Sequence, residues 1–257
     1  MCLLQNQMDA IMKQLLVLAL WLLALGAGAQ RLHVVSVGIC DYQHPRVSDL
    51  RYTEADVRSL NEVMQAHTRS IYTLLGANAT LANVRATLQQ VCAQAQPNDA
   101  ILLFFSGHGY PGGFCCYDVS PSAGRLEYAE IAALFKQSKA HRKMIFADAC
   151  FSGGLRAPKT STSSSHSMRQ SDILLFLSSR SNETSLEMRD GPNGHFTRFL
   201  VRGLTGGADT NRDRRITARE LFTFVHEGVK IATGRKQHPV MWGRFDHNMT
   251  IIHWNKK

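Results

Sequence analysis

The sequence predicts an α/β fold in which a mostly parallel central sheet carries helices on both faces. Short apolar runs rich in β-branched residues alternate along the chain with segments of helical periodicity, and this alternation is typical of parallel sheets. The 257 residues are 44% hydrophobic and 19% charged, which provides one sizeable core or two small ones and excludes a disordered or fibrous protein.

Five strands are predicted in order along the chain. Residues 32–39 form a short β-branched run, and residues 70–75 form a second one. The continuously apolar run 100–105 is typical of a central parallel strand that is covered on both faces. Two further strands are expected at 144–147 and 173–177.

Helices are expected between these strands, because apolar side chains recur there at helical spacing. The first covers residues 53–67, and the second begins after Thr80 as its N-cap and ends before Pro97. Further helices are expected around residues 131–135, 196–200 and 221–225. A final segment of mixed character is expected at residues 239–252.

The beginning of the chain resembles a secretory signal peptide. Lys13 precedes the apolar run Leu15–Leu25, and Ala27–Ala29 provides a small-residue cleavage site before Gln30. The apolar run is too short to span a hydrocarbon core of roughly 30 Å, which disfavours the alternative of an anchoring helix.

These features predict the organisation of the chain. We expect a cleaved signal peptide over residues 1–29 and a single domain over residues 30–257. If Lys13 is the basic flank of the signal peptide, the true start is Met12. A stretch rich in Ser and Thr predicts a mobile loop over residues 155–172. The mature protein is expected to be secreted or periplasmic, with no stable membrane anchor.

Cleavage of the signal peptide would leave Cys40, Cys92, Cys115, Cys116 and Cys150. An odd number of cysteines in an oxidising compartment leaves at least one thiol free. Two disulfides among the other four and reduced, buried cysteines are both open, although a bond between adjacent Cys115 and Cys116 would be strained.

The chain is basic overall, with 29 Lys and Arg residues, 20 Asp and Glu residues and a formal net charge of +9. Such a charge favours anionic surfaces or substrates but says nothing about fold. No dense basic run with interleaved aromatic residues is present, so a solvated basic face is the simpler interpretation and no nucleic-acid partner is expected.

Two predicted strands run out into residues that carry chemistry. The third is followed by Ser106–Gly109 and the fourth by Asp148–Gly154, and both segments contain glycines. Function collects beyond the carboxyl ends of parallel strands, where glycines allow sharp turns and uncover N–H groups for an oxyanion. A thiolate is a strong nucleophile, and a neighbouring imidazole lowers the thiol pKa and protonates a leaving amine. His108 and Cys150 are therefore the candidate catalytic pair.

The segments Phe104–Gly109 and Asp148–Gly154 resemble the two active-site motifs of the caspase-like cysteine peptidases, with metacaspases and their bacterial relatives as the nearest branch. True caspases carry Gln-Ala-Cys with the histidine about fifty residues upstream. Here Asp148 replaces the glutamine, and the histidine precedes the cysteine by 42 positions. The resemblance extends from Leu32 to about Ile252 and implies a three-layer αβα caspase-like fold with a mostly parallel sheet.

The resemblance also implies a binding pocket (S1) for the substrate residue before the scissile bond (P1). In the metacaspase branch, an Asp two residues before the nucleophile lines an acidic S1 pocket that receives Arg or Lys. The segment Leu50–Asp56 is similar to the family segment whose Asp completes that pocket. The implied substrate-binding residues are Thr53, Asp56, Ser106 and Asp148, the implied oxyanion donors are the N–H groups of Gly109 and Cys150, and Asn193–Thr197 matches a helix-opening motif.

The activity that the resemblance implies is endopeptidase cleavage after exposed Arg or Lys in protein or peptide substrates, with no required cofactor. A non-catalytic caspase-like binding module is the alternative. The family often carries a self-cleavage site after the nucleophile, which makes Arg156, Lys159 and Arg169 candidate cleavage sites. An inert solvated loop is the rival interpretation of that segment.

Residues 209–220 follow an EF-hand loop in their ligand positions. The candidate metal ligands are Asp209, Asn211, Asp213 and Glu220. The sixth position, normally Gly because the chain turns sharply there, is Arg214. We prefer the rival interpretation, a capping box from Thr217 to Glu220 that opens the following helix. Some metacaspases need Ca²⁺ at another site, so calcium dependence stays open.

Overall fold

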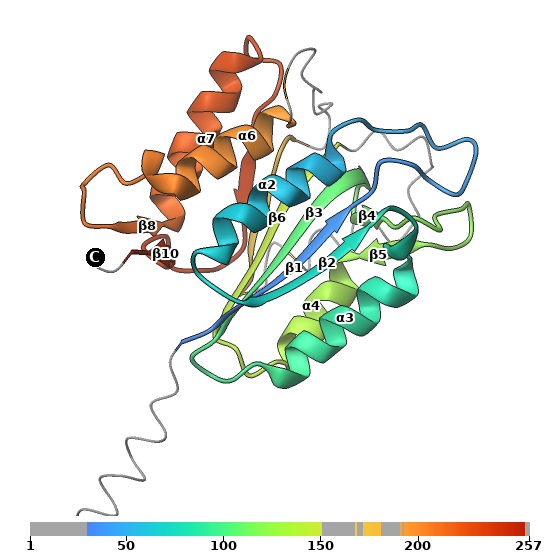
Figure 1. The fold of residues 1–257 in the computed structure, drawn as a ribbon, viewed down its shortest axis with the longest axis horizontal. Helices are drawn as coiled ribbons and strands as arrows, with labels where there is room; N and C mark the ends of the chain where they lie inside the picture. Colours follow the sequence, from blue (N-terminus) through green and yellow to red (C-terminus); the bar gives the residue numbers. More distant parts are fainter. Residues whose placement is uncertain (1–29, 151–167, 169–171, 181–190, 192, 255–257) are drawn as a thin grey trace, which may run out of the picture. The chain divides into compact units, whose positions relative to one another are not determined.

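A mostly parallel sheet forms the middle of the fold (Figure 1). The computed structural model describes residues 30–150, 168, 172–180, 191 and 193–254, with Cys150 described by its main chain alone. The strands lie in the order β2-β1-β3-β6-β7-β9, and every neighbouring pair is parallel except β7 and β9. Their bounds are β1 Leu32–Gly38, β2 Ser70–Leu75, β3 Ala100–Tyr110, β6 Arg142–Cys150, β7 Leu174–Leu177 and β9 Val240–Trp242.

Helices cover both faces of this sheet. On one face lie α3 (Leu81–Gln94) and α4 (Tyr128–Gln137), and on the other lie α2 (Thr53–Gln65), α6 (His195–Arg202) and α7 (Ala218–Ala232) (Figure 1). The three layers are the αβα architecture that the sequence predicts. Among the helices of the described ranges, none is both long and apolar enough to cross a membrane.

Alternation along the strands divides the core into two clusters. Ile101 and Leu103 on β3 belong to the cluster that includes residues of α3 and α4, whereas Leu102 and Phe104 belong to the cluster of α2, α6 and α7. All four residues are at most 1% exposed. Successive side chains of a strand point to opposite faces, which explains why a strand covered on both sides is apolar throughout.

Side-chain caps fix where two of the helices begin. Thr80 is the N-cap of α3, and its hydroxyl accepts the N–H of Asn83 at 3.3 Å. At the start of α7, the hydroxyl of Thr217 accepts the N–H of Glu220 at 3.3 Å, and the Glu220 carboxylate accepts the N–H of Thr217 at 3.0 Å. Both predicted caps are therefore confirmed.

Several short elements were not predicted. The strands are β4 Gly113–Cys115, β5 Arg125–Glu127, β8 Arg215–Thr217 and β10 Thr250–His253, and the single turns are a 3-10 turn at Gly76–Asn78 and a π turn at Gly203–Gly207. β4 pairs with both β3 and β5, while β8 pairs with β10, all antiparallel. Runs of three or four residues are too short to show a periodicity in the sequence.

β3 and β6 run farther than the sequence analysis predicted. The predicted ends were residues 105 and 147, with sharp turns at the glycines that follow, but β3 continues to Tyr110 and β6 to Cys150. Gly107 lies inside β3, where a Cβ would come within 2.8 Å of the Tyr42 hydroxyl. The expectation of a turn was wrong, because this glycine serves close packing within a strand.

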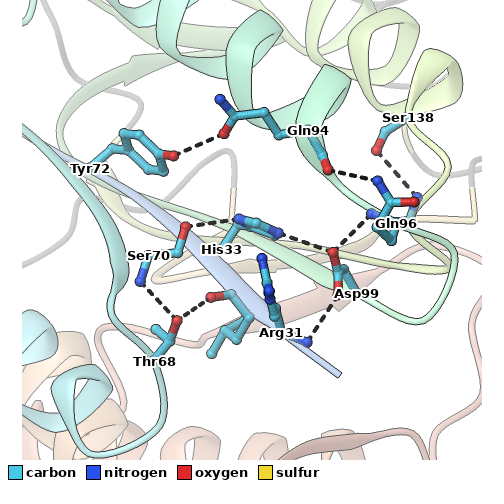
Figure 2. A network of polar contacts seen from close by, with 11 residues as sticks. Arg31, His33, Thr68, Ser70, Tyr72, Gln94, Gln96, Asp99 and Ser138 are labelled. Atoms are coloured by element: carbon cyan, nitrogen blue, oxygen red, sulfur yellow. Dashed lines mark hydrogen bonds and ion pairs between the residues drawn. The ribbon is translucent and has the colours of Figure 1, made fainter. Parts of the chain in front are cut away.

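A polar network joins β1, β2 and the turn before β3 at the end of the sheet opposite the two motifs (Figure 2). His33 lies between Ser70 and Asp99, with Nδ1 2.8 Å from the Ser70 hydroxyl and Nε2 3.2 Å from Oδ2 of Asp99. The Asp99 carboxylate also accepts the N–H groups of Arg31 at 3.0 Å and Gln96 at 2.8 Å. The network is largely buried, since His33 is 6% exposed and Asp99 is 4% exposed.

The cysteines whose side chains are described are all thiols: Cys40, Cys92, Cys115 and Cys116. The reduced alternative therefore holds for these four, and all except Cys40 are buried. Burial raises the pKa of the Cys92 thiol to about 11, which keeps it protonated and unreactive at neutral pH.

Candidate active site

The carboxyl ends of β3 and β6 bring the two motifs side by side. The parallel register pairs Ser106 with Asp148, Gly107 with Ala149, and His108 with Cys150. Neighbouring strands lie about 4.8 Å apart. The candidate base and the candidate nucleophile therefore occupy adjacent positions on the edge of the sheet.

The implied oxyanion donors belong to the same two strands. Gly109 lies on β3 opposite Phe114 of β4, and Cys150 is the last residue of β6. The candidate self-cleavage residues Arg156, Lys159 and Arg169 fall outside the described residues.

The loop between β1 and α2 orients the imidazole of His108. Its Nε2 lies 2.7 Å from the main-chain oxygen of Ser48, and the Tyr42 hydroxyl accepts the main-chain N–H of His108 at 2.7 Å. A carbonyl oxygen only accepts hydrogen bonds, so we assign the proton of the neutral ring to Nε2 and the lone pair to Nδ1. Nδ1 is then the ring atom that takes up or releases a proton. His108 is 2% exposed, which holds the ring in place.

The carboxylate of Asp56 on α2 is buried and bound by three donors. Oδ2 accepts from the Ser106 hydroxyl at 2.8 Å, while Oδ1 accepts from Asn193 Nδ2 at 3.1 Å and from the N–H of Gly194 at 3.0 Å. Burial and, after it, the negative charge of Asp148 raise the pKa of Asp56 well above its usual range, against the opposing effect of the three donors. Asp56 is 2% exposed.

The carboxylate of Asp148 lies against the first turn of α6. Its Oδ2 accepts from both the N–H of Thr197 at 3.1 Å and the Thr197 hydroxyl at 2.8 Å. A Cβ on Gly194 would approach that same oxygen to 2.6 Å. Asp148 is partly exposed, unlike Asp56, so the two carboxylates differ in their access to solvent.

The structure therefore brings three of the four implied substrate-binding residues together. Ser106 donates to Asp56 and faces Asp148 across the sheet register. Gly194 donates to Asp56 and, by lacking a Cβ, leaves room for Asp148. The two carboxyl groups are close enough for the charge of Asp148 to raise the pKa of Asp56, and both lie next to the His108 position.

Thr53, the fourth of these residues, begins α2 one turn before Asp56. Its hydroxyl lies 3.1 Å from the Sγ of Cys40, and the residue is 6% exposed. Its described polar contact is thus with a thiol in the preceding loop rather than with a carboxylate of the site.

The hydroxyl of Ser178, the residue just after β7, holds both main-chain polar groups of Ala149, the residue before the candidate nucleophile. The Oγ of Ser178 accepts the N–H of Ala149 and donates to the oxygen of Ala149, each at 3.2 Å. The main-chain oxygen of Ser178 in turn accepts from Nε2 of Gln237 at 2.9 Å. Both residues are fully buried, so they fix the end of β6 from segments that flank β7 and β9.

Sequence reasoning missed the residues that orient the site: Tyr42, Ser48, Ser178 and Gln237. Tyr42 and Ser48 lie in an irregular loop that has no periodicity to detect. The segment Asn193–Thr197 was singled out as a helix-opening motif, but its contacts with both carboxylates were not foreseen.

The EF-hand-like loop forms a turn and a helix cap. Asp209 accepts the N–H groups of Asp213 at 3.2 Å and Arg214 at 3.0 Å. Arg214 has a φ of 66°, so the chain makes the sharp turn without the glycine that the sequence analysis required. Across the part of the chain that the structure describes, no group of three or more His, Cys, Asp or Glu residues is placed to hold a metal ion. The candidate ligands, all within that part, are Asp209, Asn211, Asp213 and Glu220.

Comparison with known protein families gives a match over most of the chain. The family model described as the caspase domain matches residues 32–249. A search of curated proteins finds no match.

Solved structures with a similar fold include caspases. A protein from Geobacter sulfurreducens is 20% identical with a TM-score of 0.61, and the similarity covers 84% of this chain and 95% of that one. Caspase-1 from Spodoptera frugiperda is 16% identical with a TM-score of 0.62, covering 84% of this chain and 87% of that one. The structure of pro-sf-caspase-1 is 14% identical with a TM-score of 0.62, covering 85% and 89%. At these identities the similarities establish the fold.

The three-layer fold and the motifs at the ends of β3 and β6 define a caspase-like peptidase domain. The chain belongs to the caspase domain family, because the family model spans most of its length. Its class is thus that of the cysteine peptidases, whose substrates are proteins.

Proposed function

We propose that this protein is an exported, metacaspase-like cysteine endopeptidase that hydrolyses peptide bonds after Arg or Lys. Cys150 would be its nucleophile and His108 its general acid and base. The observation that carries the proposal is the pair of carboxylates, Asp56 and Asp148, beside the register pair of His108 and Cys150. The export part of the proposal rests on the signal-peptide pattern of residues 1–29.

In the proposed reaction, the Cys150 thiolate attacks the carbonyl carbon after the P1 residue. The oxyanion that forms would be stabilised by the N–H groups of Gly109 and Cys150. The protonated Nδ1 of His108 then gives its proton to the leaving amine, and the C–N bond breaks to leave a thioester. Water, deprotonated by His108, hydrolyses the thioester and frees the thiol.

The contact of Nε2 with the Ser48 oxygen supports the assignment of proton transfer to Nδ1 of His108. A proton held on Nε2 leaves Nδ1 to accept and release the transferred proton. The same contact stabilises the imidazolium that forms during the cycle, because the carbonyl dipole faces a ring with increased positive charge.

The two carboxylates account for the proposed specificity. Burying a guanidinium or an ammonium without a counter-charge is costly, so Asp56 and Asp148 favour Arg or Lys at P1. An Asp at P1 would be repelled by the same pair. Because burial and Asp148 raise the pKa of Asp56, entry of a cation would lower that pKa again and favour the ionised carboxylate.

Kinetics on matched fluorogenic peptides that differ only at P1 test this function. We expect cleavage after Arg and Lys, none after Asp, and none by Cys150→Ala. Assays with and without Ca²⁺ determine any metal requirement in the same experiment. Cleavage after Asp but not after Arg would overturn the assignment of the pocket.

Labelling of the thiol separates an enzyme from the alternative of a non-catalytic binding module. A peptide-based electrophile with Arg at P1 is expected to label Cys150, and excess unlabelled Arg peptide is expected to block the reaction. Absence of labelling in a folded protein would favour the binding module.

The proposal includes self-processing after Arg156, Lys159 or Arg169. Intact mass is expected to show a cut in the active enzyme that is absent from Cys150→Ala. Identical masses of the two proteins after prolonged incubation would exclude self-cleavage.

A further inference from the structure

The segment Asn193–Thr197, which leads into α6, contacts both carboxylates of the candidate S1 site. Asn193 and Gly194 donate to Asp56, and Thr197 donates to Asp148. The two carboxylates belong to α2 and β6, and this segment is therefore a common hydrogen-bond partner of both.

Thr197 holds Asp148 with two donors on one oxygen. Its N–H and its hydroxyl reach Oδ2 at 3.1 Å and 2.8 Å. Two bonds from different directions restrict rotation of the carboxylate. Both favour its ionised form, as does the amino end of the α6 helix dipole. Thr197 is 0% exposed, so water does not replace the hydroxyl easily.

Gly194 leaves the space that the same carboxylate occupies. Its backbone has φ −60° and ψ 156°, a conformation that any residue adopts. Glycine is therefore required there for space, because a Cβ would lie 2.6 Å from Oδ2 of Asp148.

We infer that Thr197 is a positioning residue that determines specificity for a P1 cation by holding Asp148 in its charged, fixed orientation. The inference rests on the proposed function, since it concerns the S1 pocket of that activity. Gly194 completes the arrangement by leaving room for the carboxylate.

The test compares Thr197→Val, which keeps the shape and removes the hydroxyl, with Thr197→Ser, which keeps the hydroxyl. Gly194→Ala displaces the carboxylate without straining the backbone. Thr87→Val is the matched control, because the Thr87 hydroxyl donates to the Asn83 oxygen on the exposed surface of α3. Each protein is assayed on a peptide with Arg at P1 and on one with citrulline, which has nearly the shape of Arg without its charge.

We expect Thr197→Val and Gly194→Ala to raise KM for the Arg peptide and to lower its kcat/KM about tenfold. The kcat/KM for the citrulline peptide should change little. The Arg-to-citrulline ratio, which is kcat/KM for the Arg peptide divided by kcat/KM for the citrulline peptide, therefore falls. Thr197→Ser and Thr87→Val should keep the ratio of the wild type. If the role of Thr197 were purely structural, Thr197→Val would lower kcat/KM for both peptides by the same factor.

The outcomes separate this inference from the proposed function. A wild-type protein without preference for Arg over citrulline contradicts the proposed function. A wild-type preference that survives in both Thr197→Val and Gly194→Ala overturns the inference alone. If Thr197→Val does not fold, an unchanged ratio in Gly194→Ala is sufficient to reject the inference.

Discussion

The hydroxyl of Tyr42 accepts the main-chain N–H of His108 at 2.7 Å, and its ring lies 5.0 Å from the imidazole, centroid to centroid. One side chain therefore holds both the backbone and the ring of the candidate base. The contact also explains Gly107, since a Cβ at that residue would approach the same hydroxyl to 2.8 Å.

Tyr42→Phe is expected to lower kcat while KM changes little. The variant keeps the ring but removes the hydroxyl that accepts the buried N–H of His108, which costs about 1–3 kcal/mol of stability. Steady-state kinetics and denaturant unfolding measure the two effects. Tyr72→Phe is the matched control, because Tyr72 bonds Gln94 on the surface. Equal kcat values for the two variants would contradict a positioning role of Tyr42.

Ser178→Ala is expected to reduce kcat about tenfold, because both bonds to the Ala149 peptide are lost next to the nucleophile. Steady-state kinetics and the rate of thiol labelling measure the effect. Ser138→Ala is the control, since Ser138 is also buried and its hydroxyl accepts the N–H of Ala140 after α4. A Ser178→Ala enzyme as fast as Ser138→Ala would show that the Ser178 hydroxyl does not position the nucleophile.

The strands could be predicted because their apolar pattern is local. Residues 70–75 were predicted as a strand and form β2 with those bounds, and the alternation of strands and helices predicted the parallel sheet. The ends of β3 and β6 could not be predicted, because Gly107 resembles a turn residue and serves packing against Tyr42. That role depends on a loop conformation that no local pattern encodes.

The candidate site could also be predicted only in part. The rule that function lies at the carboxyl ends of parallel strands placed His108 and Cys150 together, and the register agrees. The donors to the carboxylates come from far away in the sequence. Asn193 and Asp56, for example, are separated by 137 residues. Their contact depends on the docking of α6 beside α2, which a single sequence does not reveal.

Asp56→Asn is expected to remove the pH dependence of stability that this buried acid causes. Burial and the charge of Asp148 raise the pKa of Asp56, so the folded protein keeps a proton that the unfolded chain loses above about pH 4. The contribution of Asp56 to stability therefore decreases as the pH rises from that value through the raised folded pKa. An asparagine fits the site, since its oxygen can accept from Asn193 and Gly194 and its amide can donate to Ser106.

Denaturant unfolding in a Cys150→Ala background, followed from about pH 4 to about pH 8, measures this effect. The Asp56→Asn protein should gain stability relative to its parent as the pH rises. In the active background the same change should raise KM for Arg peptides. Parallel stability curves for the two proteins would contradict the raised pKa.

Asp99→Asn is expected to destabilise the fold, with a pH dependence opposite to that of Asp56→Asn. Burial alone would raise the pKa of Asp99, but the N–H groups of Gln96 and Arg31 and the imidazole of His33 outweigh it and lower the pKa. Asparagine has a single acceptor oxygen. In the variant, an NH2 group, which only donates, replaces one of the two carboxylate oxygens that these donors reach. We expect a loss of about 1–3 kcal/mol at neutral pH.

The stabilisation by Asp99 is present above the unfolded pKa of about 3.9 and is lost as the pH falls through the lower folded pKa. Unfolding of Asp99→Asn and its parent should therefore differ near pH 7 and converge in acid, again in the Cys150→Ala background. Asp246→Asn, which alters an exposed carboxylate, is the control. Because Asp99 lies at the end of β3 opposite His108, the Arg-to-citrulline ratio of the active enzyme should not change. A difference that persists undiminished below about pH 3 would show that the charge of Asp99 is not what stabilises this end of the sheet.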